Sequence, residues 1–218
     1  MPIVDVEFAM NPDPRCACVL LLDTSASMAG EPIGALNASL KAFQEDLQED
    51  PLARRRVEIA VITFGNGGVL KIQDFVPAGD FIAPVLEAAG GTPMGEAMSL
   101  ALDMVRDRKS DYKKNGIAYY QPWIFMLTDG APNPGSPWKV AAERAQAEIA
   151  AKGLVFFAVG VIDADKQVLC QITPRVLMLD GLRFRELFIW LSQSQRRVSG
   201  SKLGEQTALP AVSFGSPV

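Results

Sequence analysis

Residues 16–28 have the sequence CACVLLLDTSASM, which joins a continuous apolar run, Cys16–Leu22, to a polar segment that begins at Asp23. A strand covered on both faces has this uninterrupted apolar pattern, because neither of its faces meets water. The same pattern recurs in four other runs, which are Val57–Phe64, Trp123–Leu127, Leu154–Val161 and Val176–Leu179. These runs predict the central strands of a mostly parallel sheet.

Segments with helical spacing of apolar residues separate these strands. In Glu31–Glu49 the apolar side chains recur at steps of three and four, and Pro32 falls in the first turn, where a helix tolerates proline. Comparable spacing predicts helices over Met94–Lys109, Trp138–Ala151, Asp165–Ile172 and Arg183–Ser192. Alternation of strand and helix is typical of a doubly wound fold.

A glycine-rich turn, residues 65–68, joins Val57–Phe64 to a further strand, Val69–Phe75. Glycine together with Asn favours a tight hairpin, so we expect this strand to be antiparallel. The prediction is an α/β fold of the doubly wound type, a mostly parallel six-stranded sheet with one antiparallel edge strand and helices on both faces.

Composition indicates one domain followed by a tail. With 218 residues, 49% of them hydrophobic and 21% charged, the chain is long enough for one large globular domain, which we place at residues 1–194. Residues 195–218 are rich in Ser, Gly and Pro, so we expect a tail that is either loosely ordered or docked through Leu209, Val212 and Phe214.

Charge, cysteines and apolar runs exclude several classes of function. A net charge of −4 gives no electrostatic basis for binding nucleic acid or an anionic membrane. The apolar runs are too short to span a membrane, and the first residues lack the pattern of a signal peptide. Because no C-x-x-C pair is present, we expect Cys16 and Cys18 to be buried free thiols in a soluble, reduced, cytoplasmic protein.

The chain contains no histidine. This excludes catalysis by Ser-His-Asp or Cys-His groups and a zinc site with histidine ligands. A metal would therefore be held by oxygen atoms, which favours Mg, Mn or Ca.

Polar side chains follow two of the predicted strands. Asp23 ends the first strand and is followed by Ser25 and Ser27, and Asp129 follows the strand Trp123–Leu127. If these strands are neighbours, their ends lie about 5 Å apart. Two carboxylates at that spacing repel each other unless one is protonated or a cation lies between them.

Neutral oxygens complete the predicted site. Ser25 and Ser27 add hydroxyl groups without adding charge, and Thr92 opens the helix that starts near Met94. We predict one divalent cation, with Mg favoured over Mn or Ca, held by Asp23, Ser25, Ser27, Thr92 and Asp129. The alternative for each acidic residue alone is a helix-capping or turn role, and an N-cap role would also explain Thr92.

The three elements D-x-S-x-S, G-G-T-P-M-G and T-D-G occur in this order at residues 23–27, 90–95 and 128–130. Over Cys16–Leu191 this pattern resembles the metal-ion-dependent adhesion site (MIDAS) of von Willebrand factor A (vWA) domains. The flanking sequences LLDTSASMAGEPI and YKKNGIAYYQPWIFMLTDGAPN are similar to the bacterial TerY-like group of tellurium-resistance and stress-associated proteins.

The resemblance implies a role for each site residue. Ser25, Ser27 and Thr92 would ligate the metal directly, Asp23 and Asp129 would act mainly through water, and a vacant position would accept a partner's carboxylate. The resemblance also implies the sheet order 3-2-1-4-5-6. The segment Asn133–Pro137 departs from the group, whose members carry an acidic residue at this point.

These observations favour a binding module over an enzyme. Its partner would supply an Asp or Glu, and the TerY-like resemblance implies a kinase-like protein or a PP2C-type phosphatase in a stress-response module. The alternative is a magnesium-dependent phosphotransferase or phosphatase with Asp23 as nucleophile, although Ser25 stands where such enzymes carry a second acidic residue. A third reading is a scaffold in which the metal has only a structural role.

Overall fold

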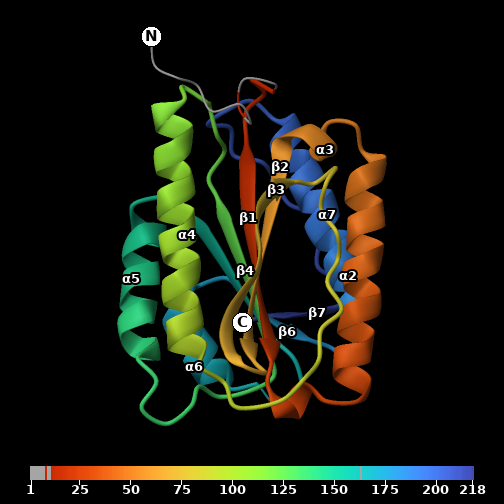
Figure 1. The fold of residues 1–218 in the computed structure, drawn as a ribbon, viewed down its shortest axis with the longest axis vertical. Helices are drawn as coiled ribbons and strands as arrows, with labels where there is room; N and C mark the ends of the chain where they lie inside the picture. The colour runs from red at the N-terminus through yellow and green to blue at the C-terminus, as the bar shows by residue number, and fades with distance from the viewer. Residues whose placement is uncertain (1–7, 9–10, 163) are drawn as a thin grey trace.

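The computed structural model describes residues 8, 11–162 and 164–218, and its centre is a seven-stranded sheet (Figure 1). The strands are β1 (Cys16–Thr24), β2 (Val57–Gly65), β3 (Gly68–Pro77), β4 (Trp123–Thr128), β5 (Val155–Gly160), β6 (Val176–Leu179) and β7 (Gly215–Pro217). Their order is β3-β2-β1-β4-β5-β6-β7, and all neighbours are parallel except the two edge strands β3 and β7. The mostly parallel α/β fold is confirmed, with one strand more than predicted.

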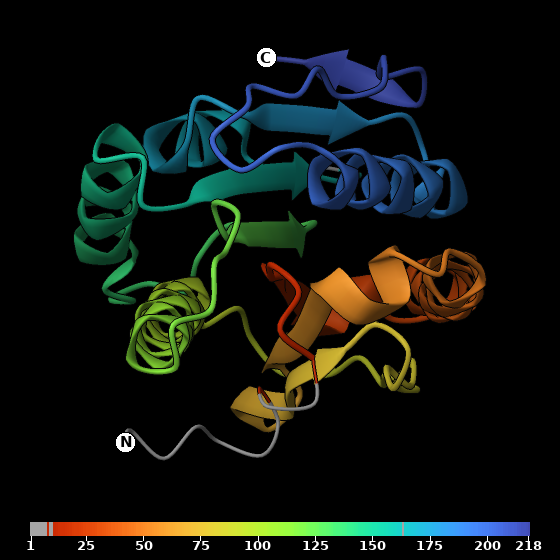
Figure 2. The same cartoon turned by 90° about the horizontal axis from the view of Figure 1, so that it is seen from above.

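Helices cover both faces of the sheet, as the view from above shows (Figure 2). The helices α2 (Glu31–Glu49) and α7 (Phe184–Gly200) cover one face. The other face is covered by α4 (Met94–Lys114), α5 (Trp138–Ala150) and α6 (Lys166–Ile172). Two short elements, η1 (Ala26–Met28) and α3 (Ala53–Arg56), lie in the connections around α2.

The alternation of side chains along β1 explains its apolar sequence. Leu20 and Leu22 pack in the core under α2 and α7, whereas Val19 and Leu21 pack in the core under α4 and α5. All nine residues of the strand are buried, so no position is available for a solvated side chain. The burial of Cys16 and Cys18 as free thiols is confirmed.

The C-terminal residues are docked on the domain, one of the two alternatives that the sequence left open, but α7 and the sheet extend further than predicted. Helix α7, expected to end at Ser192, continues to Gly200. Beyond it, Phe214 is buried against Trp190, with 6.1 Å between the ring centroids, and β7 pairs with β6. The tail therefore lies on the edge of the sheet and supplies the seventh strand. No helix within the described ranges is long and apolar enough to cross a membrane.

Candidate functional site

The carboxyl ends of β1 and β4 lie side by side at the lower edge of the sheet in Figure 1. The two strands pair in parallel as far as Leu22 and Leu127, so Asp23 and Thr128 follow at adjacent positions. Asp129 is the next residue along the chain. The predicted neighbourhood of the two strand ends is therefore confirmed.

The segment after β1 curls tightly. Ser25 donates its backbone N–H to Asp23 Oδ1 at 2.8 Å, and the turn η1 follows directly. The curl brings Ser25 Oγ to within 3.0 Å of Ser27 Oγ. Asp23 therefore sets the shape of the loop that carries both hydroxyl groups.

A hydrogen bond joins this loop to the end of β4. Ser27 Oγ donates to Asp129 Oδ1 at 2.8 Å, and Thr128 Oγ1 donates to Asp23 Oδ2 at 2.5 Å. Asp23 is fully buried, Asp129 is 7% exposed, and Ser27 faces solvent. Asp23 is therefore the buried base of the site and Ser27 its exposed rim.

Thr92 reaches the same place from the loop before α4. A Cβ atom placed on Gly130 would lie 3.4 Å from Thr92 Oγ1, which puts the hydroxyl beside the residue after Asp129. The N-cap role that the sequence offered for Thr92 is wrong, because α4 starts at Met94 and its N-cap residue is Pro93. The Thr92 hydroxyl is therefore not used as a cap.

Asn133 holds Thr92 in this position, a role that the sequence did not reveal. Its Oδ1 accepts the Thr92 N–H at 2.8 Å, and its own N–H donates to the Thr92 carbonyl at 3.0 Å. Next to this pair, Ser136 Oγ accepts the Gly95 N–H at 3.1 Å. The segment Asn133–Pro137, which differs from the TerY-like group, thus connects the loop that carries Thr92 to the loop that carries Asp129.

Gly65 allows the loop after β1 to lie against the hairpin of β2 and β3. It has a φ of +149°, and a Cβ atom at this position would lie 2.2 Å from the carbonyl carbon of Thr24. Asn66 and Ala89 both donate N–H groups to the Thr24 carbonyl. The backbone just before Ser25 is therefore fixed from two sides.

Burial raises the pKa of Asp23 from 3.8 to about 6. The nearby charge of Asp129 acts in the same direction, while hydrogen bonds from Ser25 and Thr128 oppose the shift. Within the described residues, no Lys or Arg forms an ion pair with Asp23. The fold thus removes water from this carboxylate without supplying a cation of its own.

The donor set fits a hard divalent cation. Neighbouring oxygens around octahedral magnesium are about 3 Å apart, given metal–oxygen distances of about 2.1 Å. The separations of Ser27 Oγ from Ser25 Oγ and from Asp129 Oδ1, 3.0 and 2.8 Å, match that spacing. In the part of the chain that the structure describes, no three Asp, Glu, Cys or His side chains form a metal cluster. A cation here would therefore depend on hydroxyl groups as well as on two carboxylates.

Comparison with known families agrees with this architecture. Residues 18–178 match the family model of the von Willebrand factor type A domain. The chain belongs to this family. No curated protein matches it significantly.

Solved structures share the vWA fold at low sequence identity. The vWF domain of the type V pili tip protein Mfa5 from Porphyromonas gingivalis has a TM-score of 0.66 and 12% identity, over 89% of this chain and 99% of its own. The pilus adhesin SpaC from Lactobacillus rhamnosus GG, in its open conformation, has a TM-score of 0.64 and 17% identity, over 85% of this chain and 30% of its own.

A third similar structure is proximal thread matrix protein 1 from the mussel byssus, described with a zinc-occupied MIDAS motif. It has a TM-score of 0.56 and 18% identity, over 85% of this chain and 49% of its own. This vWA domain thus spans less than half the length of the mussel protein and of SpaC.

Proposed function

We propose that this vWA domain binds a partner protein through one divalent cation at a MIDAS-type site formed by Asp23, Ser25, Ser27, Thr92 and Asp129. The observation that carries the proposal is the hydrogen bond from Ser27 to Asp129, which brings the two strand ends together at ligand spacing. Mg is the preferred cation because all donors are hard oxygens, and Mn or Ca would use the same donors.

The site residues divide into two roles in this proposal. The hydroxyl groups of Ser25, Ser27 and Thr92 would bind the cation directly. Asp23 and Asp129 would act mainly through bound water, and their two negative charges would balance the dication. Since the chain supplies few charged ligands, an Asp or Glu of the partner would complete the coordination. Such a contact is directional and lies at the exposed rim beside Ser27.

Two findings favour this binding role. The similar structures include two pilus proteins and a mussel protein whose MIDAS motif holds zinc. Asp23 is also a poor nucleophile as it stands, because it is fully buried and each of its oxygens accepts a hydrogen bond. A phosphotransferase that uses Asp23 would need that carboxylate exposed to substrate.

The cellular setting is a finer part of the proposal. The flanking sequences that resemble the TerY-like group suggest a bacterial stress-response module, with a kinase-like protein or a PP2C-type phosphatase as the partner. The three free cysteines are consistent with a reduced compartment such as the cytoplasm.

Calorimetric titration with MgCl2 and MnCl2 tests the metal site. We expect measurable binding by the wild type, and at least about tenfold weaker binding by Ser27→Ala and Asp129→Asn, because each removes one oxygen contact to the cation or to its water. Ser110→Ala, on α4, is the matched control and should bind as the wild type does. Unchanged affinity in Ser27→Ala and Asp129→Asn would contradict the proposal.

Two further measurements separate the alternatives. Pull-down of partners with Mg and with a chelator distinguishes an adhesive metal from a structural one, and we expect a partner that is lost with chelator and with Ser27→Ala. Hydrolysis of an aryl phosphate that requires Mg and disappears in Asp23→Asn would instead support the phosphatase alternative.

A further inference from the structure

A cavity of about 1100 Å³ lies at the opposite end of the sheet from the MIDAS-type site. Trp123 and Val155, where β4 and β5 begin, line it, together with the segment 204–207 and Leu209 that follow α7. Asp129 follows Trp123 by six positions, so the two sites are about 20 Å apart at roughly 3.3 Å per residue. This volume is slightly above the usual range for small-molecule pockets, which ends at about 1000 Å³.

The walls of the cavity are positively charged. Lys109, Lys113, Lys152 and Arg175 line it together with Glu205, and Glu148 forms an ion pair with Lys109, so four cations stand against two carboxylates. The whole chain has a net charge of −4, so this excess is local. Across the described ranges, no carboxylate forms an ion pair with Lys113, Lys152 or Arg175. Cations gathered around one hollow repel one another and attract an anion.

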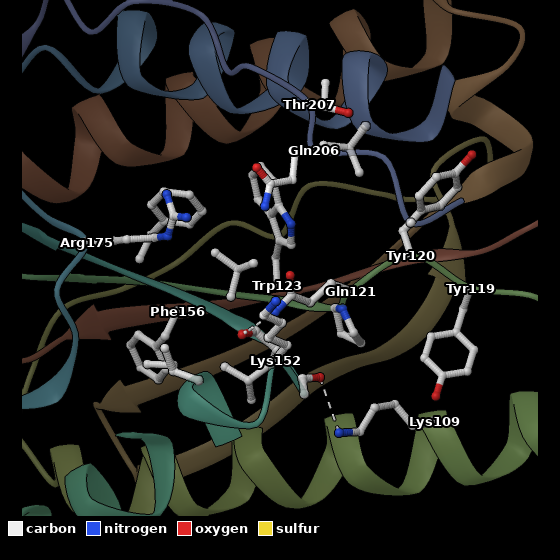
Figure 3. A pocket seen from close by; sticks show the side chains of 18 of the residues that line it. Lys109, Tyr119, Tyr120, Gln121, Trp123, Lys152, Phe156, Arg175, Gln206 and Thr207 are labelled. Atoms are coloured by element: carbon white, nitrogen blue, oxygen red, sulfur yellow. Dashed lines mark hydrogen bonds between the residues drawn. The ribbon is translucent and has the colours of Figure 1, made fainter. Parts of the chain in front are cut away.

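Two of the cations are held in place by the fold. Lys109 Nζ donates to Glu148 Oε2 at 3.0 Å and to the Gly153 carbonyl at 3.2 Å. The guanidinium of Arg175 lies 5.5 Å from the centre of the Phe157 ring. Figure 3 shows Arg175 and Lys109 at opposite ends of the pocket, with Gln206 and Thr207 above them. Charges fixed in advance lose less conformational entropy when a ligand binds.

The backbone of Lys152 is also fixed by the fold. It follows the C-terminus of α5 with a φ of +54°, a left-handed conformation that strongly favours glycine. This conformation belongs to a Schellman motif at the helix end, in which Lys152 and Gly153 donate their N–H groups to the carbonyls of Ile149 and Glu148. Thr207 also lines the cavity, and its Oγ1 is buried without a hydrogen-bond partner among the residues that the structure describes.

We infer that this cavity binds a small anion with several phosphate groups. Arg and Lys at its two ends can bind separate phosphates, and the Thr207 hydroxyl gains a hydrogen-bond partner. Inorganic polyphosphate and a nucleoside triphosphate share this chemistry. The cavity is separate from the metal site, so the inference does not depend on the proposed function.

Calorimetry of the full chain with sodium tripolyphosphate and with ATP, both in EDTA, tests the inference. We expect binding that weakens as NaCl is added, and at least about tenfold weaker binding in Lys152→Gln and in Arg175→Gln, since each removes a charged hydrogen-bond donor. Lys41→Gln on α2 and Arg185→Gln on α7 remove exposed charges elsewhere and should bind as the wild type does. ATP binding tighter than tripolyphosphate would identify a nucleotide, and equal affinity would identify the phosphate chain alone.

Lys152→Gly separates a binding role from a structural one. Glycine relieves the left-handed strain, so we expect a higher melting temperature together with weaker tripolyphosphate binding. Ser27→Ala should leave this binding unchanged, which keeps the result distinct from that at the metal site. The inference is overturned if neither probe binds at millimolar concentration, if Lys152→Gly and Arg175→Gln bind as the wild type does, or if a hexaglutamate peptide binds as tightly as tripolyphosphate.

Discussion

Ser27 Oγ lies 2.8 Å from Asp129 Oδ1, which connects residues 102 positions apart in the sequence. This hydrogen bond joins the loop after β1 to the loop after β4 at the point where both reach solvent. The same hydroxyl can donate to the carboxylate or offer a lone pair to a cation. Ser27 is therefore the residue on which the closure of the site and the proposed binding of metal both depend.

Gly65→Ala should disrupt the site from outside it. The new Cβ would overlap the Thr24 backbone at a φ of +149°, so we expect destabilisation of more than about 1 kcal/mol and loss of Mn binding. Gly34→Ala, in α2, is the control, because nothing lies within 4 Å of its new Cβ. It should raise the free energy of unfolding by up to about 1 kcal/mol. Urea denaturation measures the stability of both variants. A Gly65→Ala variant as stable as the wild type would contradict the close approach of Gly65 to the Thr24 backbone.

Asp23 should make the metal-free protein less stable as pH rises. Its pKa of about 6 in the folded state exceeds its ordinary value of 3.8, so the folded protein binds more protons between these pH values. The stabilising contribution is complete below about pH 4 and is lost as pH rises through 6, with a size on the order of 3 kcal/mol. Urea denaturation in EDTA between about pH 4 and pH 6 should show that the free energy of unfolding falls in the wild type and that Asp23→Asn removes this decrease. If the stability of the variant depended on pH as that of the wild type does, Asp23 would not be the group responsible.

The three thiols should differ in reactivity. Burial raises the pKa of Cys16 to about 12 and that of Cys18 well above 9.0, whereas Cys170 is exposed. Because the thiolate is the reactive form, we expect one thiol to react with a disulfide reagent at pH 8 in the native protein and all three after unfolding. Cys170→Ser should abolish the native reaction. Rapid labelling of Cys16 in the folded state would be inconsistent with its burial.

Glu58 should be among the most sensitive buried positions. Its carboxylate lies 2.9 Å from Arg15 Nε and 2.8 Å from Arg108 Nε, and Tyr112 donates to it as well. Glu58→Gln leaves buried guanidinium charge uncompensated, which should cost about 3 to 5 kcal/mol of unfolding free energy. Glu148→Gln, at a partly exposed ion pair with Lys109, should cost less than about 1 kcal/mol. If thermal or urea denaturation showed the same loss of stability in Glu58→Gln and in Glu148→Gln, the expected difference would be contradicted.

The strands themselves and the position of the acidic residues were predictable because they depend on patterns that are local in sequence, whereas the strand order followed only from the resemblance to vWA domains. The run Cys16–Leu22 is apolar throughout since both faces of β1 are covered, and Asp23 is the first polar residue after that run, although it is buried as well. The hairpin at residues 65–68 was equally clear from its glycines. These features locate the end of each strand in the sequence, whereas the pairing of β1 with β4 that brings the two ends together is a long-range contact.

The features that the sequence did not reveal depend on contacts between distant segments. The later part of α7 looked like a polar tail, yet Ser194 is buried and donates to the Trp190 carbonyl, and Gln195 accepts from Cys16. Strand β7 has no apolar side chain and exists because its backbone pairs with β6. Likewise, only the fold shows that Asn133 holds Thr92.

The measurement that tests the central claim most directly is anomalous diffraction from a crystal grown with MnCl2. The account predicts one anomalous peak within about 2.3 Å of the hydroxyl oxygens of Ser25 and Ser27, with Thr92 on the same ion or on its water. It also predicts that this peak is absent from Ser27→Ala crystals grown in the same way. A wild-type crystal in saturating manganese that shows no peak between the ends of β1 and β4 would contradict the account.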